Sequence, residues 1–320
     1  MERSLQYFGE AIIDYAGLFP PAKLDLPVAF ENYQEYMHSA DSWMLGRFVC
    51  PVTKLAELGK LLPEGGGSRI FTVSALGRGG NSYEEFLKNL SEDLKLIALF
   101  QDDYHHEVRI EILETRIPEL DDEKRSFVAA IQQELDKHTH LRPIPSFEVS
   151  LPEENWKESI EDAIDAVNYM NLHHRTSHRP ASLKLRCGGL EAEQFPSIEQ
   201  VSFFICSCRD HKLPFKCTAG LHHPIRHFDD TVQAPMHGFI NLFGSALLAN
   251  HHHLSQAQVS DILSDEQVDN FGFTPDGFYW RNLSIPVDSI HELRRGHALS
   301  FGSCSFTEPL HDLRSLGWIR

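Results

Sequence analysis

Basic residues are scarce in this sequence compared with acidic ones. Its 29 Lys and Arg stand against 46 Asp and Glu, which gives a formal net charge of −17 at pH 7. A charge of this sign and size repels phosphate backbones and anionic lipid surfaces. We therefore expect neither nucleic acid nor a membrane as a partner.

Long apolar runs are also missing. The longest stretch without Asp, Glu, Lys or Arg, Val232 to Ser260, is interrupted by Pro235, Asn241 and the run His251 to His253, so it does not read as a membrane span. The first residues, Met1 to Ser4, lack the basic-then-apolar pattern of a secretory signal. The sequence predicts a cytoplasmic protein.

Cysteines are few and none forms a C-x-x-C pair, which excludes a disulfide scaffold. Cys206 and Cys208 lie two positions apart in an expected helix, so they face different ways and cannot grip one metal ion together. We expect them to be small buried apolar side chains. The six cysteines are Cys50, Cys187, Cys206, Cys208, Cys217 and Cys304.

What is present is the composition of an ordinary globular protein. Hydrophobic residues make up 42% and charged residues 23% of the 320 residues, which excludes disorder, collagen and coiled coil. Length alone fits two domains of about 150 residues or one closed α/β barrel of about 250 residues with insertions.

Eight short apolar runs alternate with longer amphipathic stretches, the pattern of βα units around a parallel sheet. The expected strands are 11–15, 47–52, 70–76, 108–115, 146–151, 182–187, 215–219 and 299–306. The expected helices are 28–37, 55–62, 83–100, 123–135, 155–172, 198–211, 237–250 and 310–316. We predict an α/β fold, a (β/α)8 TIM barrel that occupies 1–320 as a single domain. A doubly wound open sheet is the alternative.

The segment 254–297 does not fit the repeat and is expected to be an accessory insertion before the last strand. Its centre, 271–280, places turn residues between aromatic arms, which predicts a hairpin. Long loops on a compact barrel are commonly lids, so we expect this lobe to cover the barrel mouth.

Two lysines stand on strands that are otherwise apolar. Lys184 lies in the sixth expected strand and Lys216 in the seventh. Alternation sends Lys184 and Arg186 to one face, and Lys216 and Thr218 to one face. Burial and neighbouring positive charge both lower the pKa of a lysine, so we expect Lys184 to carry a partly neutral amine that attacks carbonyl carbons.

The carboxylates nearby are candidate acids, bases or metal ligands. Glu148 stands on the fifth expected strand, while Glu111 and Glu114 stand on the fourth with opposite parity, so only one of those two faces inward. The alternative to a reactive amine is a structural one, in which Lys184 pairs with Glu148 or Glu114 in a buried ion network.

Strands six and seven resemble a known family. Lys184 followed by Gly188 and Gly189, and Lys216 followed by Gly220, resemble class I aldolases of the deoxyribose-phosphate aldolase type. The resemblance implies that Lys184 forms a Schiff base and that Lys216 tunes it or moves the proton. It covers these two strands only, and Arg186 and the His222-His223-Pro224 string depart from it.

A second resemblance spans the whole chain. The strings 14–21, 218–224 and 301–306 are similar to a family of uncharacterised bacterial proteins. This resemblance implies no particular chemistry.

Residues that follow the last three strands form a candidate anion-binding site, because barrels often bind phosphate or carboxylate there through glycines and backbone N–H groups. The candidates are Arg186, Gly188, Gly189, Thr218, Gly220, Ser303, Ser305 and, after the first strand, Asp14.

These features predict an enzyme for a small anionic carbonyl compound, an aldolase-like lyase with Lys184, Lys216 and Glu148 as catalytic residues and no cofactor. The alternative is a metal-dependent isomerase, lyase or hydrolase in which His222 and His223, with Asp14, Glu148 or Cys304, hold zinc or manganese. A third reading is a barrel that binds a ligand without catalysis. The sequence leaves a homo-oligomer open.

Overall fold

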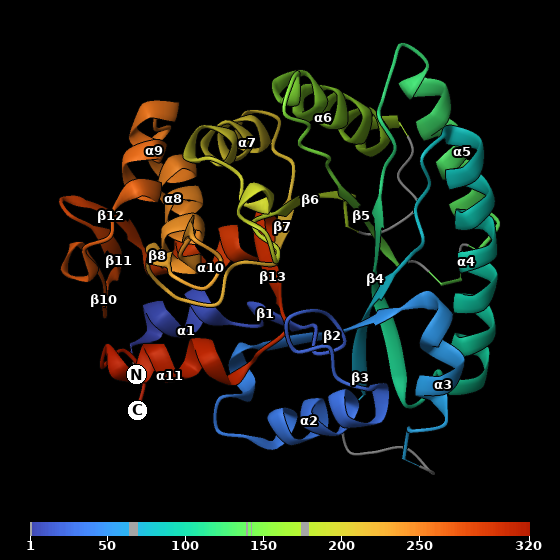
Figure 1. Ribbon diagram of the computed structural model, residues 1–320, viewed down its shortest axis with the longest axis horizontal. Helices are drawn as coiled ribbons and strands as arrows, with labels where there is room; N and C mark the ends of the chain where they lie inside the picture. Colours follow the sequence, from blue (N-terminus) through green and yellow to red (C-terminus); the bar gives the residue numbers. More distant parts are fainter. Residues whose placement is uncertain (1, 64–69, 139, 142, 174–178) are drawn as a thin grey trace. The chain divides into compact units, whose positions relative to one another are not determined.

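The structure is a computed structural model that describes residues 2–63, 70–138, 140–141, 143–173 and 179–320. Eight parallel strands form one closed barrel in the order β1-β13-β7-β6-β5-β4-β3-β2 (Figure 1). The predicted (β/α)8 barrel is confirmed, and the open sheet is excluded. The barrel strands are β1 (Ile13–Tyr15), β2 (Leu45–Pro51), β3 (Phe71–Leu76), β4 (Val108–Arg116), β5 (Ile144–Glu148), β6 (Ser182–Arg186), β7 (Phe215–Thr218) and β13 (Ala298–Ser303).

Contacts divide the chain into two compact units. The first unit comprises Met1–Lys23, Tyr36–Gly46 and Arg186–Arg320, and the second comprises Leu24–Glu35 and Arg47–Leu185. Strands β1, β7 and β13 belong to the first unit and β3, β4 and β5 to the second, while β2 and β6 run across the boundary.

Helices follow the barrel strands along the chain, as the alternation predicts. Up to residue 173 they are α1 (Arg3–Gly9), α2 (Leu26–His38), η1 (Ser42–Met44), η2 (Val52–Lys54), α3 (Leu55–Gly59), α4 (Tyr83–Tyr104), α5 (Lys124–Asp136) and α6 (Trp156–His173). The remaining helices are η3 (Ala192–Gln194), α7 (Ile198–Asp210), α8 (Phe239–His252), α9 (Gln256–Ser264), η4 (Val268–Asn270), α10 (Val287–Gly296) and α11 (Thr307–Ser315). Within the described residues, no helix has both the length and the apolar character needed to cross a bilayer.

Local sequence signals explain where these helices begin and which face they bury. The Ser82 side chain accepts a hydrogen bond from the Glu85 amide at the start of α4, and Ser197 with Gln200 forms a capping box at the start of α7. Apolar residues three or four apart then make a buried stripe along α4. That stripe contains Phe86, Leu90, Leu94 and Ile97.

The predicted hairpin within 271–280 is confirmed. Strands β10 (Phe271–Thr274) and β11 (Gly277–Trp280) pair antiparallel around a turn. A third strand that the sequence analysis missed, β12 (Leu283–Pro286), pairs with β11. A second small hairpin, β8 (His227–Asp229) with β9 (Ala234–Met236), was also missed.

The accessory lobe packs against α1, and the predicted lid role is wrong. The Ser4 hydroxyl donates a hydrogen bond to the Thr274 carbonyl at 2.6 Å, and the Phe8 ring lies 5.2 Å from Phe273 and 5.3 Å from Phe278. Figure 1 shows the β10-β11-β12 sheet beside α1 and α8.

The position of the insertion in the chain explains this placement. Helix α1 leads into β1, and α10 leads directly into β13, so the lobe sits where these strands begin. A connection from a helix to the next strand lies at the amino ends of barrel strands, whereas active sites form at the carboxyl ends. A segment inserted between α8 and β13 therefore cannot roof the mouth.

Candidate functional site

In the second unit, one amine meets two carboxylates on adjacent strands. The Lys184 Nζ atom lies 2.6 Å from Glu114 Oε2 and 2.8 Å from Glu148 Oε2. The side chains of Lys184 and Glu114 are 5% and 2% exposed, while that of Glu148 is 13% exposed. We call Lys184, Glu114 and Glu148 the lysine network.

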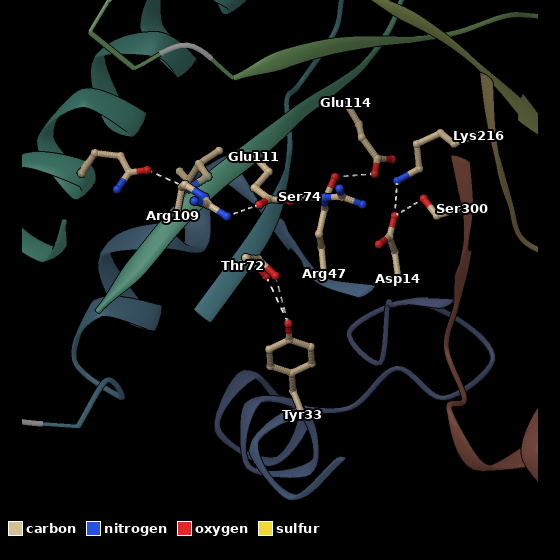
Figure 2. Close-up of polar contacts among 12 residues, drawn as sticks. Asp14, Tyr33, Arg47, Thr72, Ser74, Arg109, Glu111, Glu114, Lys216 and Ser300 are labelled. Atoms are coloured by element: carbon tan, nitrogen blue, oxygen red, sulfur yellow. Dashed lines mark hydrogen bonds and ion pairs between the residues drawn. The ribbon is translucent and has the colours of Figure 1, made fainter. Parts of the chain in front are cut away.

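Strand register and parity assemble the lysine network. Glu148 at the end of β5 is the Cα partner of Lys184 in the middle of β6. Glu114 lies near the end of β4, and Figure 2 shows the Ser74 hydroxyl, from β3, hydrogen-bonded to its carboxylate at 2.5 Å. This bond holds Glu114 in place from a fourth strand.

Glu111 has the parity opposite to Glu114 and takes no part in the lysine network. It pairs with the Arg47 guanidinium at 2.9 Å and also with Arg109 (Figure 2). The prediction that only one of Glu111 and Glu114 joins the buried face is confirmed.

The pKa of Lys184 is raised, and the prediction that it is lowered is wrong. Burial acts to lower its pKa, but the charges of Glu114 and Glu148 and the hydrogen bonds to them outweigh burial and raise the pKa above the ordinary value of 10.5. Arg186, the cation expected to act on Lys184, has an exposed side chain at the end of β6. The ion network that the sequence offered as the alternative is present.

Two buried serines lie on the same face as the lysine network. Register places Glu114 opposite Ser146 and Ser146 opposite Ser182. Both hydroxyls are fully buried, and within the described residues neither oxygen has a hydrogen-bond partner. Buried polar groups ordinarily form hydrogen bonds. These two hydroxyls can therefore form hydrogen bonds with a polar group that binds at this face.

Sequence analysis missed Arg116, which ends β4 on the same face. Register makes Arg116 the Cα partner of Glu148, and its exposed side chain donates a hydrogen bond to Ser150 Oγ at 3.2 Å. Within the described residues no carboxylate pairs with Arg116. The signal was available, because Arg116 is two positions after Glu114 and so shares its face.

Lys216 belongs to a buried network of the first unit. Its Nζ atom lies 2.7 Å from Asp14 Oδ2, and the Ser300 hydroxyl donates to the same oxygen at 2.7 Å (Figure 2). Lys216 and Asp14 are fully buried. A Cβ at Gly46 would lie 2.4 Å from Asp14 Oδ1, so a glycine is needed there. Asp14, predicted to bind an anion or a metal, instead neutralises Lys216.

The glycines predicted to bind an anion have a packing role. A Cβ on Gly188 would lie 2.7 Å from the Gly220 Cα, and Gly220 has a φ of +67°. Gly189 packs against the Gln194 side chain, whose Oε1 accepts from the Leu190 amide. These glycines let the chain segments after β6 and β7 approach each other closely.

The remaining anion-binding candidates have local hydrogen bonds or contacts. Arg186 donates to the Gly188 carbonyl at 3.4 Å, and Thr218 lies against Gly302. Ser303 donates to the Ser305 carbonyl, and Ser305 Oγ accepts from the amide of Glu308, which shapes the turn into α11. An anion-binding role for these side chains stays a prediction.

The metal alternative lacks a ligand set. His222 and His223 each face a carboxylate of α11, with His222 Nδ1 at 2.8 Å from Glu308 and His223 Nδ1 at 2.6 Å from Asp312. Within the described residues, no three His, Cys, Asp or Glu side chains gather in a metal-binding arrangement. Of the carboxylates proposed to join the histidines, Asp14 pairs with Lys216 and Glu148 with Lys184, while the third candidate, Cys304, has its Sγ atom 4.0 Å from His222 Nε2.

No protein-family model matches the chain, and no curated protein sequence matches it. Its chemistry must therefore be argued from its own residues.

Proposed function

We propose that the chain is an aldolase-like lyase that makes and breaks bonds beside the carbonyl group of a small anionic compound through Lys184. One observation carries the proposal: a buried amine lies within hydrogen-bond distance of two carboxylates in a barrel, on strands whose carboxyl ends form active sites in this fold. The local resemblance of strands six and seven to class I aldolases supports it.

A protonated amine cannot act as a nucleophile, so a base must first take its proton. The two carboxylates of the lysine network can do this. Glu148 and Glu114 each lie close enough to accept a proton from Lys184 as the substrate arrives. The amine nitrogen then bonds to the carbonyl carbon, the oxygen leaves as water, and an imine forms. The imine draws the electron pair of a neighbouring C–C or C–H bond, and a carboxylate moves the proton.

The two carboxylates are suited to different tasks. Glu148 is the more exposed member of the network, so we assign it proton exchange with substrate and leaving water. Glu114 is fixed by Ser74, so we assign it the positioning of Lys184. Arg116, exposed and without a carboxylate partner in the described part of the chain, is the group we assign to the substrate's anionic end.

Charge and cysteine chemistry support the remaining parts of the proposal. A net charge of −17 disfavours nucleic acid as a partner. A small anionic substrate can still bind where cationic side chains such as Arg116 attract it locally. All six cysteines are free, as expected of a protein in the reducing cytoplasm.

Reductive trapping tests the amine directly. We expect a panel of small aldehydes and keto acids with borohydride to add one reduced imine to the folded protein, located at Lys184 by peptide mass mapping. Lys184→Arg abolishes the adduct, while Lys157→Arg on exposed α6 leaves it unchanged. An absent adduct across the panel, or equal labelling of surface lysines, leaves the lysine network as a structural ion cluster.

Glu148→Gln keeps the amine and removes the proposed base. We expect it to slow adduct formation on the order of 100-fold, the usual scale of general acid–base catalysis. Thermal unfolding of each variant shows that the protein is folded. An unchanged rate in folded Glu148→Gln contradicts the role of Glu148.

A further inference from the structure

A cysteine, a histidine and a glutamate of the first unit form a continuous line of polar contacts. Cys304 Sγ lies 4.0 Å from His222 Nε2, and His222 Nδ1 lies 2.8 Å from Glu308 Oε2. Cys304 directly follows β13, His222 follows β7, and Glu308 lies in the first turn of α11. None of the three belongs to the lysine network.

The order of these atoms has a chemical consequence. The hydrogen bond between Nδ1 and Glu308 orients the ring so that Nε2 faces the sulfur, the arrangement in which an imidazole and a cysteine exchange a proton. Cys304 also lies three residues before the first residue of α11.

The surroundings of His222 raise the pKa of its imidazole. Burial acts to lower the pKa of His222, but hydrogen bonds and charge interactions with Cys304 and Glu308 outweigh it and raise the pKa to about 9. The pKa of the Glu308 carboxyl is lowered, chiefly by its hydrogen bond to His222. An imidazolium between a carboxylate and a sulfur can deliver a proton to a leaving group.

Burial raises the pKa values of four other thiols. Burial raises the pKa of Cys50 to about 12 and places the pKa values of Cys208 and Cys217 well above the ordinary 9.0. Cys206 is as buried as Cys304, at 8% against 9% exposure, but its pKa is also raised by burial. Cys206 therefore serves as a matched control.

The cluster opens at the protein surface. The Glu308 side chain is 45% exposed and the His222 side chain 14% exposed. One turn further along α11, Asp312 holds His223 in the same way, so a second imidazole borders the approach. Glu308 is therefore the exposed end of the cluster.

We propose that Cys304 is a nucleophile that accepts acyl groups from activated esters or thioesters, with His222 as the proton donor and Glu308 as the positioning residue. The sulfur bonds to the acyl carbon, and the bond from that carbon to the leaving oxygen or sulfur breaks. The leaving group keeps the electron pair and takes the proton from His222 Nε2. Water then adds to the acyl carbon, gives its proton to His222 and releases the acid and the thiolate.

Acylation and alkylation of the native protein test the proposal. With p-nitrophenyl acetate or limiting iodoacetamide, we expect mass on Cys304 at least about tenfold faster than on Cys206, since only Cys304 of the two has an imidazole beside its sulfur. Cys304→Ser removes the fast adduct and the release of p-nitrophenol that accompanies it, and Cys206→Ser changes neither. Labelling of Cys304 no faster than Cys206 overturns the proposal.

The histidine and glutamate are tested without removing the sulfur. We expect His222→Gln to slow acylation about tenfold or more. Glu308→Gln shifts the pH profile of Cys304 alkylation, an effect that a merely structural role does not produce. An unchanged rate in folded His222→Gln, together with an unchanged profile in Glu308→Gln, contradicts the assigned roles.

Discussion

A lysine side chain buried in a barrel needs an anion beside it, and the partners of Lys184 and Lys216 differ in kind. Lys216 and Asp14 are both fully buried, so no substrate reaches them without rearrangement. Lys184 has two carboxylates, and one of them, Glu148, retains 13% exposure. The two lysines therefore differ in the exposure of their carboxylate partners.

The protonation of His222 makes a testable contribution to stability. Its folded-state pKa of about 9 lies above the ordinary 6.5, so the contribution is full below pH 6.5 and lost as pH rises through 9. We expect His222→Gln to lower the free energy of unfolding by roughly 2 kcal/mol at pH 6 and by much less at pH 9.5. Urea unfolding at both pH values measures it.

The control for that pH series is His211→Gln, which replaces an exposed histidine. His222→Gln could instead lower the free energy of unfolding by the same amount at pH 6 and pH 9.5. That result would mean that Cys304 and Glu308 do not stabilise the protonated form of His222.

Sequence reasoning found the residues of the lysine network but predicted the wrong direction for the pKa shift of the amine. Parity along β4, β5 and β6 identified Lys184, Glu114 and Glu148 as members of buried strands. Parity along a strand does not predict which atoms come into contact, and the contacts of the Lys184 amine decide its pKa. Strand parity could not identify Glu308, because Glu308 lies in α11 and is 86 residues away from His222 in the sequence.

At the scale of elements, local patterns predicted what is locally determined. Each barrel strand begins close to its predicted position, and turn chemistry located the hairpin of β10 and β11. Short elements such as α1 and β12 were missed because they contain too few residues to show a recognisable hydrophobic periodicity. The side of the barrel on which the lobe packs follows from connectivity, which composition does not reveal.

Arg294 of α10 is the link between the lobe and the strands it leads into. It is 5% exposed and donates to the carbonyls of Phe8 at 2.6 Å and Glu10 at 3.2 Å, and to those of Ala298 and Leu299 in β13. We expect Arg294→Met to lower the free energy of unfolding by about 2–4 kcal/mol, because it leaves several buried carbonyls without a donor.

Its neighbour Arg295 provides the matched control. Arg295 is exposed and contacts only His291 among the described residues, so Arg295→Met should cost less than about 0.5 kcal/mol. Chemical denaturation of the two variants gives the comparison. Equal stabilities would show that Arg294 does not anchor the lobe.

For the whole molecule, closure of the barrel brings the two ends of the chain together. β1 pairs with β13, with Asp14 opposite Gly302, and β13 pairs with β7. The alternation of eight strands and helices predicted this closure, since a ring of eight parallel strands places the first beside the last. The polar groups that hold those three strands together required the structure.

The ion pair of Asp14 with Lys216 joins strands 202 residues apart, and Ser300 ties β13 to the same carboxylate. We expect Lys216→Met to lower the free energy of unfolding by about 3–5 kcal/mol, because it leaves a buried carboxylate without its cation. The double variant Asp14→Asn/Lys216→Met should regain much of that loss, since neither charge remains.

Lys137→Met, which breaks an exposed pair with Glu134 on α5, should stay within about 0.5 kcal/mol of the parent. Urea unfolding of the parent, Asp14→Asn, Lys216→Met and the double variant gives the coupling energy, and Lys137→Met is measured beside them. A cost for Lys216→Met no larger than that for Lys137→Met, or a double variant less stable than either single one, would show that the pair does not hold the closing strands together.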